Sequence, residues 1–425
     1  MNMQIRFTLF CLLVCAAAQA QNTSSPYSIY GIGDIQTSAY NRTVGMGSTG
    51  IAYRSDNSII QNNPASYTAL TQQYFHVEMG ARGQFSTYTN ASYTNNVGAS
   101  DISNDFTVTR FAVATKVNKL WGFSAGIMPY SQMNYSFTAE KPLGPQGEFA
   151  ATSYDGTGGI HKAYWGNGFQ LGKHLSLGFT SSFLFGALQQ EQTLVAPTAN
   201  ADLLTTRNLY LRNVNFDFGA QYYTQFGKDK KWGLALGATY SPKQRLYAED
   251  SLTVLDNGST IINNALLDRN FLNIPETYGA GIAVSKDSRM RKITFLADYQ
   301  RQEWTPLGYT GTGYALQNSD KYSAGIEIVK RTNIFNTPVE HVYYQLGGFY
   351  DRSYLSISGS AVQEWGASAG IGVNPLRYPK WGYNVALEYG ARGNYQPGTI
   401  REDYARLTIT IHYWDIWLTK GRRVN

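Results

Sequence analysis

The strongest constraint on the fold of this chain is a strict alternation of apolar and polar residues in many short segments. Between residues 175 and 185, leucine and phenylalanine occupy most of the odd-numbered positions, and serine, glycine and threonine lie between them. Residues 214–222, 381–390 and 406–413 repeat the pattern, and Asp217 falls on the polar face of the first of these. A period of two is typical of β-strands with one apolar and one polar face.

Segments of this kind follow one another along the whole chain. The connections between them alternate between long polar stretches, such as residues 137–159 and 248–274, and short turns. Outer-membrane barrels have long external loops and short periplasmic turns. The sequence therefore predicts an all-β fold, a transmembrane antiparallel β-barrel of fourteen strands. The strands are expected at residues 73–88, 104–117, 120–136, 160–172, 174–188, 206–226, 232–247, 275–286, 292–304, 320–330, 340–350, 359–373, 381–392 and 402–414.

The composition favours a membrane barrel over a soluble domain. The chain has 32 Tyr, 20 Phe, 8 Trp and 42 Gly but only 15% charged residues. Beyond the first twenty residues, no stretch approaches the roughly 18 consecutive apolar residues that a transmembrane helix needs. In a barrel, alternate residues face lipid and lumen, so many aromatic residues are compatible with a low mean hydropathy. We expect an integral outer-membrane protein surrounded by outer-membrane lipid.

The first residues have the pattern of an export signal. Residues 7–17 form an apolar core, and Ala18-Gln19-Ala20 provides a cleavage site of the small-x-small kind. We therefore expect residues 1–20 to be a cleaved signal peptide. A lipid attachment at Cys15 is the less favoured alternative, because Val14 replaces the small residue that should precede it. Both cysteines of the chain lie in this segment, so the exported protein has no disulfide available.

The formal net charge of +6 does not indicate a nucleic-acid partner, because the basic residues gather at the predicted short-turn end. A solvated basic rim at this end is the simpler interpretation, and docking to an anionic periplasmic partner is the alternative. The residues concerned are Lys116, Lys119, Lys173, Lys228, Lys230, Lys231, Arg289, Arg291, Lys292, Lys330, Arg331, Lys380, Lys420, Arg422 and Arg423.

Residues 21–72 differ from the rest because they show no sustained period of two. We expect them to form a hatch that folds into the lumen, with residues 73–425 forming the barrel, and a small periplasmic extension is the alternative. Gly45, Gly47 and Gly50 match the letters of the dinucleotide fingerprint G-x-G-x-x-G. That fingerprint requires a following helix, which the pattern here does not predict, so we expect these glycines to serve tight turns and no cofactor to bind.

Several motifs in order carry a resemblance to a known family. They are Gly45-Met46-Gly47-Ser48-Thr49-Gly50-Ile51-Ala52, Asp56-Asn57-Ser58, Asn62-Asn63-Pro64-Ala65-Ser66-Tyr67, Ile274-Pro275-Glu276-Thr277-Tyr278-Gly279-Ala280-Gly281 and Ala297-Asp298-Tyr299-Gln300. Together they resemble the FadL/TodX family of outer-membrane transport proteins, whose hatch has a Gly-rich start and an Asn-Pro-Ala motif.

The resemblance implies a barrel plugged by its hatch, which passes hydrophobic molecules toward a lateral opening beside a kinked third strand. Gly126-Ile127-Met128-Pro129 interrupts the third predicted strand, and proline is confined to strand edges and bulges. A bulge that merely bends the wall is the alternative. The residues expected to act in gating are Gly45, Gly47, Gly50, Asn63, Pro64 and Ala65 in the hatch and Gly126 and Pro129 at the kink.

The C-terminus departs from the family pattern, because residues 414–425 continue beyond the last predicted strand. This tail resembles the Bacteroidetes branch of the family, which includes barrel subunits of type IX secretion and of the outer-membrane protein assembly machinery. Two hypotheses follow. The chain takes up a hydrophobic ligand such as a fatty acid, or it is a non-transporting barrel subunit that binds proteins of an envelope complex.

The predicted lumen helps to separate these hypotheses. A channel predicts an apolar cavity behind the hatch, whereas a structural subunit predicts a filled, polar lumen. The inward faces of the predicted strands carry mostly Ser, Thr, Asn, Gln and Gly, which favours the polar lumen.

An enzyme is not expected. The five histidines are scattered, with no metal-ligand spacing. Gly122-Phe123-Ser124-Ala125-Gly126 has the letters of a nucleophile elbow, but it lies inside a strand and lacks the required strand-turn-helix context. A barrel-embedded lipid hydrolase would need Ser124 to be paired with a histidine.

Overall fold

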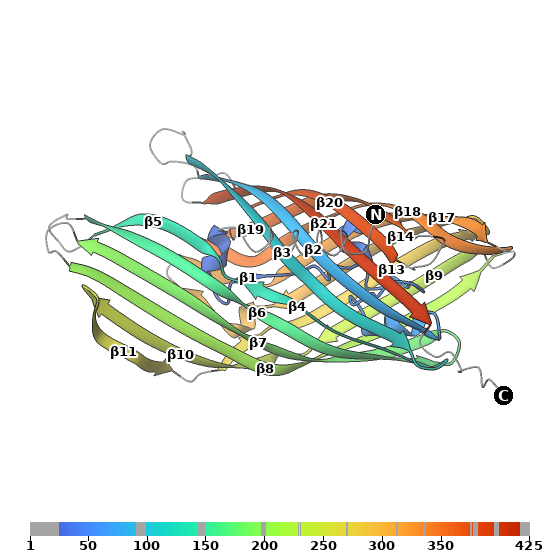
Figure 1. Ribbon diagram of the computed structural model, residues 1–425, viewed down its shortest axis with the longest axis horizontal. Helices are drawn as coiled ribbons and strands as arrows, with labels where there is room; N and C mark the ends of the chain where they lie inside the picture. Colours follow the sequence, from blue (N-terminus) through green and yellow to red (C-terminus); the bar gives the residue numbers. More distant parts are fainter. Residues whose placement is uncertain are drawn as a thin grey trace, which may run out of the picture.

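The chain forms a single antiparallel sheet that closes into a barrel of fourteen strands (Figure 1). The computed structural model describes residues 25–416 except 91–98, 143–148, 197–200, 228, 230, 269–270, 312, 335, 375, 377–380 and 395–398. Closure is made by β21, which pairs with β2 from Ile416 and Tyr74 to Ile400 and Asn90. The expected signal peptide, both cysteines and the end of the C-terminal tail lie outside the described residues.

The barrel strands differ widely in length. They are β2 (Tyr74–Asn90), β3 (Ala99–Lys116), β4 (Trp121–Gln132), β5 (Tyr135–Pro142), β6 (Phe149–Leu171), β7 (Leu175–Ala196), β8 (Ala201–Phe226), β9 (Trp232–Ser241), β10 (Gln244–Asp256), β11 (Ser259–Asp268), β12 (Phe271–Ile274), β13 (Glu276–Ser288), β14 (Arg291–Glu303), β17 (Ser319–Ile334), β18 (Thr337–Ile357), β19 (Ser360–Val373), β20 (Trp381–Arg392) and β21 (Ile400–Ile416). A short helix η5 (Thr305–Leu307) and two small strands, β15 (Thr310–Gly311) and β16 (Tyr314–Leu316), lie between β14 and β17.

Within the described residues, three of the fourteen wall strands change direction or break at points that the sequence or the pairing marks. The wall strand made of β9 and β10 breaks at Pro242, and that made of β12 and β13 breaks at Pro275. A third wall strand changes from β4 to β5 between Gln132 and Tyr135. Proline cannot donate to a β-ladder, so the first two breaks follow directly from the sequence.

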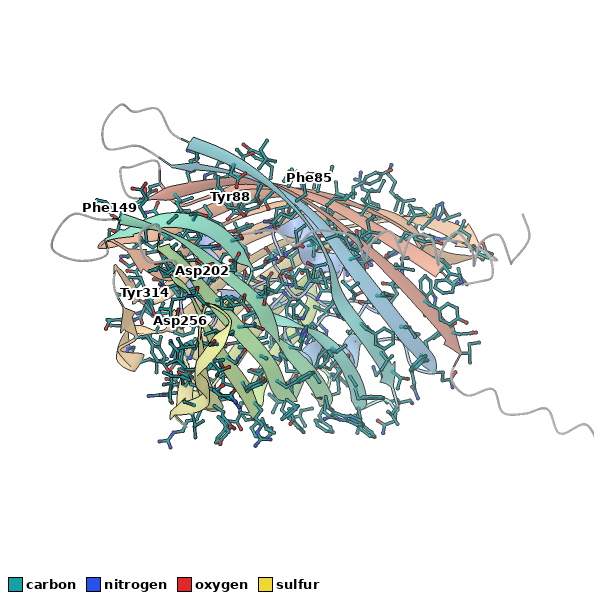
Figure 2. All side chains as sticks on the ribbon, turned by 60° about the vertical axis from the view of Figure 1, so that its left-hand side comes forward. Phe85, Tyr88, Phe149, Asp202, Asp256 and Tyr314 are labelled. Atoms are coloured by element: carbon teal, nitrogen blue, oxygen red, sulfur yellow. The ribbon has the colours of Figure 1, made fainter. Side chains whose placement is uncertain are left out.

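The predicted fold class is confirmed, and each of the fourteen predicted strands overlaps a wall strand. The long loops predicted at residues 137–159 and 248–274 are wrong, because these ranges are largely strand, in β5, β6, β10, β11 and β12. Beyond the membrane both faces of a strand meet water, so the alternation that marks a strand fades while its hydrogen bonds continue. The ends of β8 and β10, at Asp202 and Asp256, extend side by side in this way (Figure 2).

The outer surface carries an apolar band that faces the lipid. On β2, Phe85 points outward and is 61% exposed, whereas Tyr88 points inward and is 7% exposed (Figure 2). Exposed aromatic residues form a girdle near the short-turn end and a second girdle farther up, which is the pattern of membrane interfaces. The lower girdle comprises Phe169, Tyr222, Phe226, Trp232 and Trp381, and the upper one Tyr240, Tyr278, Tyr322, Tyr350, Trp365 and Tyr389. Among the described residues, no helix is long and apolar enough to cross a membrane.

Residues 25–72, here called the N-terminal segment, contact inward-facing residues of many wall strands and are largely buried (Figure 1). The segment contains three short 3-10 helices and a two-residue strand, β1, which pairs with β4. These elements are η1 (Pro26–Ile29), β1 (Asp34–Ile35), η2 (Arg42–Met46) and η3 (Pro64–Ala69).

Candidate functional site: the barrel interior and a gap in the wall

The three glycines of the G-x-G-x-x-G sequence lie where the N-terminal segment meets the wall. The amide of Gly47 donates to Ser368 Oγ at 2.8 Å, and the amide of Gly50 donates to Asp298 Oδ2 at 2.6 Å. Gly47 has φ +64, and a Cβ there would lie 2.6 Å from the carbonyl oxygen of Gly348. A Cβ on Gly45 would lie 2.5 Å from Gln345 Oε1. Glycine is therefore required for close packing, and no βαβ unit surrounds it.

The Asn-Pro-Ala sequence begins η3 and ties it to the wall. Asn63 Oδ1 accepts from the amide of Ala65 at 3.1 Å and caps the helix, and Pro64 takes the first turn, where no donor is needed. Asn63 Nδ2 points at three carbonyl oxygens, those of Ile51, Ala220 and Ala238, at 3.0 to 3.2 Å. Ala65 is fully buried. One side chain thus joins two parts of the segment to β8 and β9.

An ion-pair cluster holds η2 against β17 and β18. Arg42 Nε lies 2.8 Å from Glu327 Oε2, and Arg42 Nη1 lies 2.6 Å from Glu340 Oε1. Tyr53 Oη donates to Glu327 Oε1 at 2.6 Å, and Gln345 Nε2 donates to Glu327 Oε2 at 2.8 Å. Burial lowers the pKa of Arg42, but the two carboxylates more than offset it and raise that pKa well above its ordinary value. Arg42 therefore stays charged inside the barrel.

Two further interior ion pairs lie beside the N-terminal segment. Arg110 Nη2 lies 3.3 Å from Glu78 Oε2 and donates to the carbonyl of Ile59 in the N-terminal segment. Arg392 Nη1 lies 2.8 Å from Oδ1 of Asp34, the first residue of β1. Charged wall residues therefore hold the segment at Asp34 and at Ile59.

The wall has a gap between β3 and β4. These strands pair over only six residue pairs, from Phe111 with Ile127 to Lys116 with Gly122. Above this stretch, β3 has one extra residue opposite β2, at Thr109, and the β4 register with β6 shifts between Pro129 and Ser131. Bulges bend strands and end pairing. Residues 99–110 of β3 thus have no ladder partner on the β4 side within the described chain, and we call this interval the wall gap.

The residues predicted at the kink lie at the lower border of the wall gap. A Cβ on Gly126 would lie 2.4 Å from the carbonyl oxygen of Phe111 and 2.8 Å from the ring of Tyr164, so this glycine permits close packing just below the gap. Pro129 still opposes His161 of β6, directly before the register shift.

The N-terminal segment lies behind the wall gap. Above Pro129, β4 turns to pair with β1, with Ile35 opposite Ser131 and Asp34 opposite Gln132. The amide of Ser25 donates to the carbonyl of Asn134 at 2.7 Å. A pocket of about 310 Å³ lies here, and its lining is mainly polar. The charged and ionisable members of that lining are Asp34, Arg82, Asp105, His161 and Glu402.

Next to this pocket is an apolar cavity of about 390 Å³ in the outer half of the barrel. It shares Met133 with the pocket behind the wall gap, and the ion pair of Arg207 and Asp250, with atoms 2.6 Å apart, contributes to its lining. Its apolar lining comprises Ile29, Ile32, Met133, Leu188, Leu209, Leu246, Leu272, Trp304 and Leu316. The prediction that inward faces are polar therefore fails in this part of the barrel.

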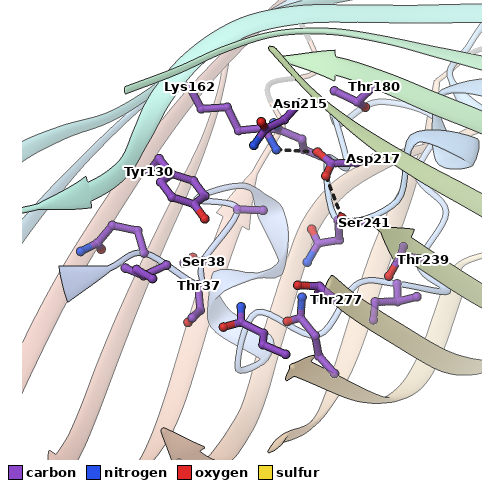
Figure 3. Close-up of a pocket in the computed structure, with 18 of the residues that line it drawn as sticks. Thr37, Ser38, Tyr130, Lys162, Thr180, Asn215, Asp217, Thr239, Ser241 and Thr277 are labelled. Carbon is purple, nitrogen blue, oxygen red and sulfur yellow. Dashed lines mark hydrogen bonds and ion pairs between the residues drawn. The ribbon is translucent and has the colours of Figure 1, made fainter. Parts of the chain in front are cut away.

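The cavity between the N-terminal segment and β6, β8 and β9 is polar, as predicted (Figure 3). It has a volume of about 250 Å³. Lys162 Nζ lies 2.6 Å from Asp217 Oδ2, and Ser241 Oγ donates to Asp217 Oδ1 at 2.7 Å. Tyr130, Thr180 and other hydroxyl groups complete the lining (Figure 3). The ion pair and the hydroxyl groups make most of this lining polar.

Ser124 does not meet a histidine. It is fully buried, and its Oγ lies 3.2 Å from Tyr164 Oη. Among the described residues, no three His, Cys, Asp or Glu side chains gather as a metal site.

The interior residues that the sequence did not single out are the charged ones, including Arg42, Glu78, Arg110 and Glu327. The sequence could have indicated Glu327, because it is a carboxylate on the inward face of an alternating strand, where small or amide residues were expected. Its partner could not be named, because Arg42 lies 285 positions away in the sequence.

Comparison with known proteins gives one family match. A family model described as BamG matches residues 1–425. None of the curated proteins matches the chain. The resemblance to FadL/TodX proteins noted above therefore concerns the fold, and the family model that matches is a different one.

Solved structures with the same fold include three outer-membrane proteins. A FadL homologue from Pseudomonas aeruginosa has a TM-score of 0.60 at 13% identity and covers 91% of this chain and 100% of its own. The toluene transporter TodX of P. putida has a TM-score of 0.56 at 15% identity, with 92% and 99% covered. The toluene transporter TbuX of Ralstonia pickettii has a TM-score of 0.51 at 13% identity, with 88% and 97% covered. At these identities the likeness establishes the fold alone.

Proposed function

The chain belongs to the BamG family, and on that premise we propose that it is a non-transporting barrel subunit of an outer-membrane assembly complex, of the kind that assembles outer-membrane proteins. In this proposal the N-terminal segment is a fixed plug. The observation that carries it is the buried ion-pair cluster that joins Arg42 to Glu327 and Glu340.

The contacts of the N-terminal segment oppose repeated movement. Removing one partner of a buried ion pair costs about 3–5 kcal/mol, and a segment that shifts for every transported molecule would separate such pairs each time. The segment also touches wall glycines through its backbone. A Cβ at Gly237 would lie 2.3 Å from the carbonyl oxygen of Ile51, and one at Gly178 would lie 2.5 Å from the amide nitrogen of Ala65. Packing this close to backbone leaves no room for sliding.

The polarity of the interior supports the same proposal. An apolar ligand gains about 25 cal/mol for each square ångström that it transfers from water to an apolar surface. Most side chains that line the cavity around Asp217 are polar, and an apolar ligand behind the wall gap would lie against charged groups without hydrogen bonding to them.

The apolar cavity favours a second candidate function, the uptake of a hydrophobic ligand such as a fatty acid. It could hold an acyl chain, and Met133 connects it to the pocket behind the wall gap. In that case Gly126 and Pro129 would form the border of a lateral exit. Asn63, Pro64, Ala65 and the glycines 45, 47 and 50 would position the segment behind it.

Purification of the tagged protein from native membranes in mild detergent tests the two candidates together. The co-purifying proteins and the extracted lipids are identified by mass spectrometry, with untagged membranes as the control. Stoichiometric envelope proteins without a bound ligand support the assembly subunit. A solitary barrel that retains fatty or aromatic molecules overturns it in favour of uptake.

A further inference from the structure

Within the described chain, the wall gap leaves one edge of β3 with backbone groups that no neighbouring strand pairs. In a regular strand, the residues whose N–H and C=O groups point to one neighbour alternate with those that point to the other. The amide of Ile102 bonds the side chain of Asp101 at 2.8 Å, which marks it as pointing to the open side. By the same alternation, the N–H and C=O groups of Asn104, Phe106 and Val108 point there too. We call residues 102–108 the β3 edge.

A second break in the wall shows how the protein closes such an interval by itself. On the side where β8 pairs first with β10 and then with β9, its residues 213–217 have no ladder partner, although β7 pairs with them on the other side. There Gln244 Oε1 accepts from the amide of Phe216 at 3.1 Å, and Gln244 Nε2 donates to the carbonyl of Phe216 at 2.9 Å. An amide side chain thus replaces the missing strand. Within the described residues, nothing plays this role for Phe106 and Val108.

The β3 edge lies at the height of the lipid. Its outward side chains are apolar, with Ile102 73%, Phe106 41% and Val108 55% exposed. Phe85 of β2, which lies opposite Asn104, is also outward and exposed (Figure 2). Lipid chains cannot hydrogen bond, and an unsatisfied backbone group in the hydrocarbon costs several kcal/mol, so open sheet edges are not left facing lipid.

We propose that the β3 edge is the docking site for an extended strand of a different polypeptide, which adds to the sheet beside β3. Such a strand supplies a donor and an acceptor at every second residue, which is the spacing of the open groups. The inward side chains next to the edge include Asp101 and Asp105, and Glu402 lines the same pocket as Asp105. The partner strand therefore carries apolar residues on its lipid side and polar or basic residues on its inner side.

A second copy of this chain does not fit the β3 edge. Two copies in one membrane are related by an axis along the membrane normal, so their β3 strands run in the same direction and tilt in opposite senses. An antiparallel ladder needs opposite directions and a common tilt. The N-terminal segment is not available either, because its β1 is already paired with β4.

The inference rests on the proposed function, because it names the surface through which an assembly partner binds. Photocrosslinking in intact cells tests it. A benzophenone amino acid replaces Ile102 or Phe106, and Leu346 or Leu387 serves as the control, since both are 61% exposed on the outer surface of other strands. We expect one protein adduct of defined mass from the β3 edge and only lipid adducts from the controls.

Two substitutions of Phe106 distinguish a strand that is hydrogen bonded to the β3 edge from a protein that merely lies near it. With the probe at Ile102, Phe106→Pro removes one edge donor and should reduce the adduct by about tenfold, the effect of one lost hydrogen bond. Phe106→Ala keeps that donor and should retain the adduct. Proline is tolerated at strand edges, so the barrel should still fold, which heat-modified gel mobility checks.

Several outcomes would overturn the inference. They are lipid adducts alone at the β3 edge, an adduct of twice the chain's mass, equal adducts at the control positions, or an unchanged adduct in Phe106→Pro. If envelope proteins co-purify but do not crosslink to the edge, this inference fails while the proposed function stands.

Discussion

Arg42 Nε and Glu327 Oε2 lie 2.8 Å apart in the barrel interior, and neither side chain is more than 3% exposed. The pair joins η2 of the N-terminal segment to β17, and Tyr53 and Gln345 satisfy the remaining positions around the carboxylate. A charge in this place is stable only while its partner is present.

Glu327→Gln should destabilise the folded barrel by about 3–5 kcal/mol, because it leaves the Arg42 guanidinium without its most buried carboxylate. Urea unfolding of the purified protein in detergent measures the change. Lys231→Gln is the control, since its pair with Asp229 lies on the surface, and it should change the free energy of unfolding by less than about 1 kcal/mol. Equal effects of the two substitutions would show that the interior pair does not hold the segment.

Gly47→Ala should loosen the contact between the N-terminal segment and β18. The new methyl group would lie 2.6 Å from the carbonyl oxygen of Gly348, and overpacking of this kind costs about 1–3 kcal/mol. Gly258→Ala is a matched control, because Gly258 also has a positive φ, +78, but has nothing within 4 Å of the Cβ position. The difference between the two variants isolates the contact. Limited proteolysis of the segment provides the readout, and equal cleavage would contradict the expectation.

Gln244→Ala should weaken the wall at the break near Pro242. It removes the side chain that bonds both backbone groups of Phe216, and an unsatisfied group of this kind costs about 1–3 kcal/mol. Heat-modified gel mobility should show a lower unfolding temperature. Gln189→Ala, which removes a side-chain bond to Glu191, should have little effect. An unchanged unfolding temperature in Gln244→Ala would show that Gln244 does not replace the missing strand beside Phe216.

Leu272→Gln tests the second candidate function, because Leu272 lines the apolar cavity and is only partly buried. A polar side chain there should remove any bound acyl chain and leave recovery of partner proteins unchanged. Lipid and protein mass spectrometry of the purified variant measures both. A parallel loss of partner proteins would mean that the cavity belongs to the assembly function itself.

The sequence predicted the wall better than the interior. Alternation placed Asp217 and Gln221 on the inward face, where the structure has them, because one residue step decides the face of a strand. The same pattern led to a wrong prediction at residues 137–159, which were expected to be a loop. A strand outside the membrane needs no apolar face, so its sequence need not alternate. The pairing of Arg392 with Asp34 joins residues 358 positions apart in the sequence, so no local pattern could predict it. The residues themselves predicted only a kink at Gly126 and Pro129, and the lateral opening beside it was implied by the family resemblance.

The most direct test of a fixed N-terminal segment is a disulfide that locks it to the wall. Thr68 Oγ1 and Ser176 Oγ lie 2.9 Å apart and are buried, so Thr68→Cys with Ser176→Cys should link η3 to β7, and the exported chain is expected to have no other cysteine. Partner recovery and fatty-acid uptake are compared between the oxidised and reduced forms, with each single variant as a control. The account predicts equal partner recovery and no uptake that depends on reduction. Uptake that stops on oxidation and returns on reduction would contradict it.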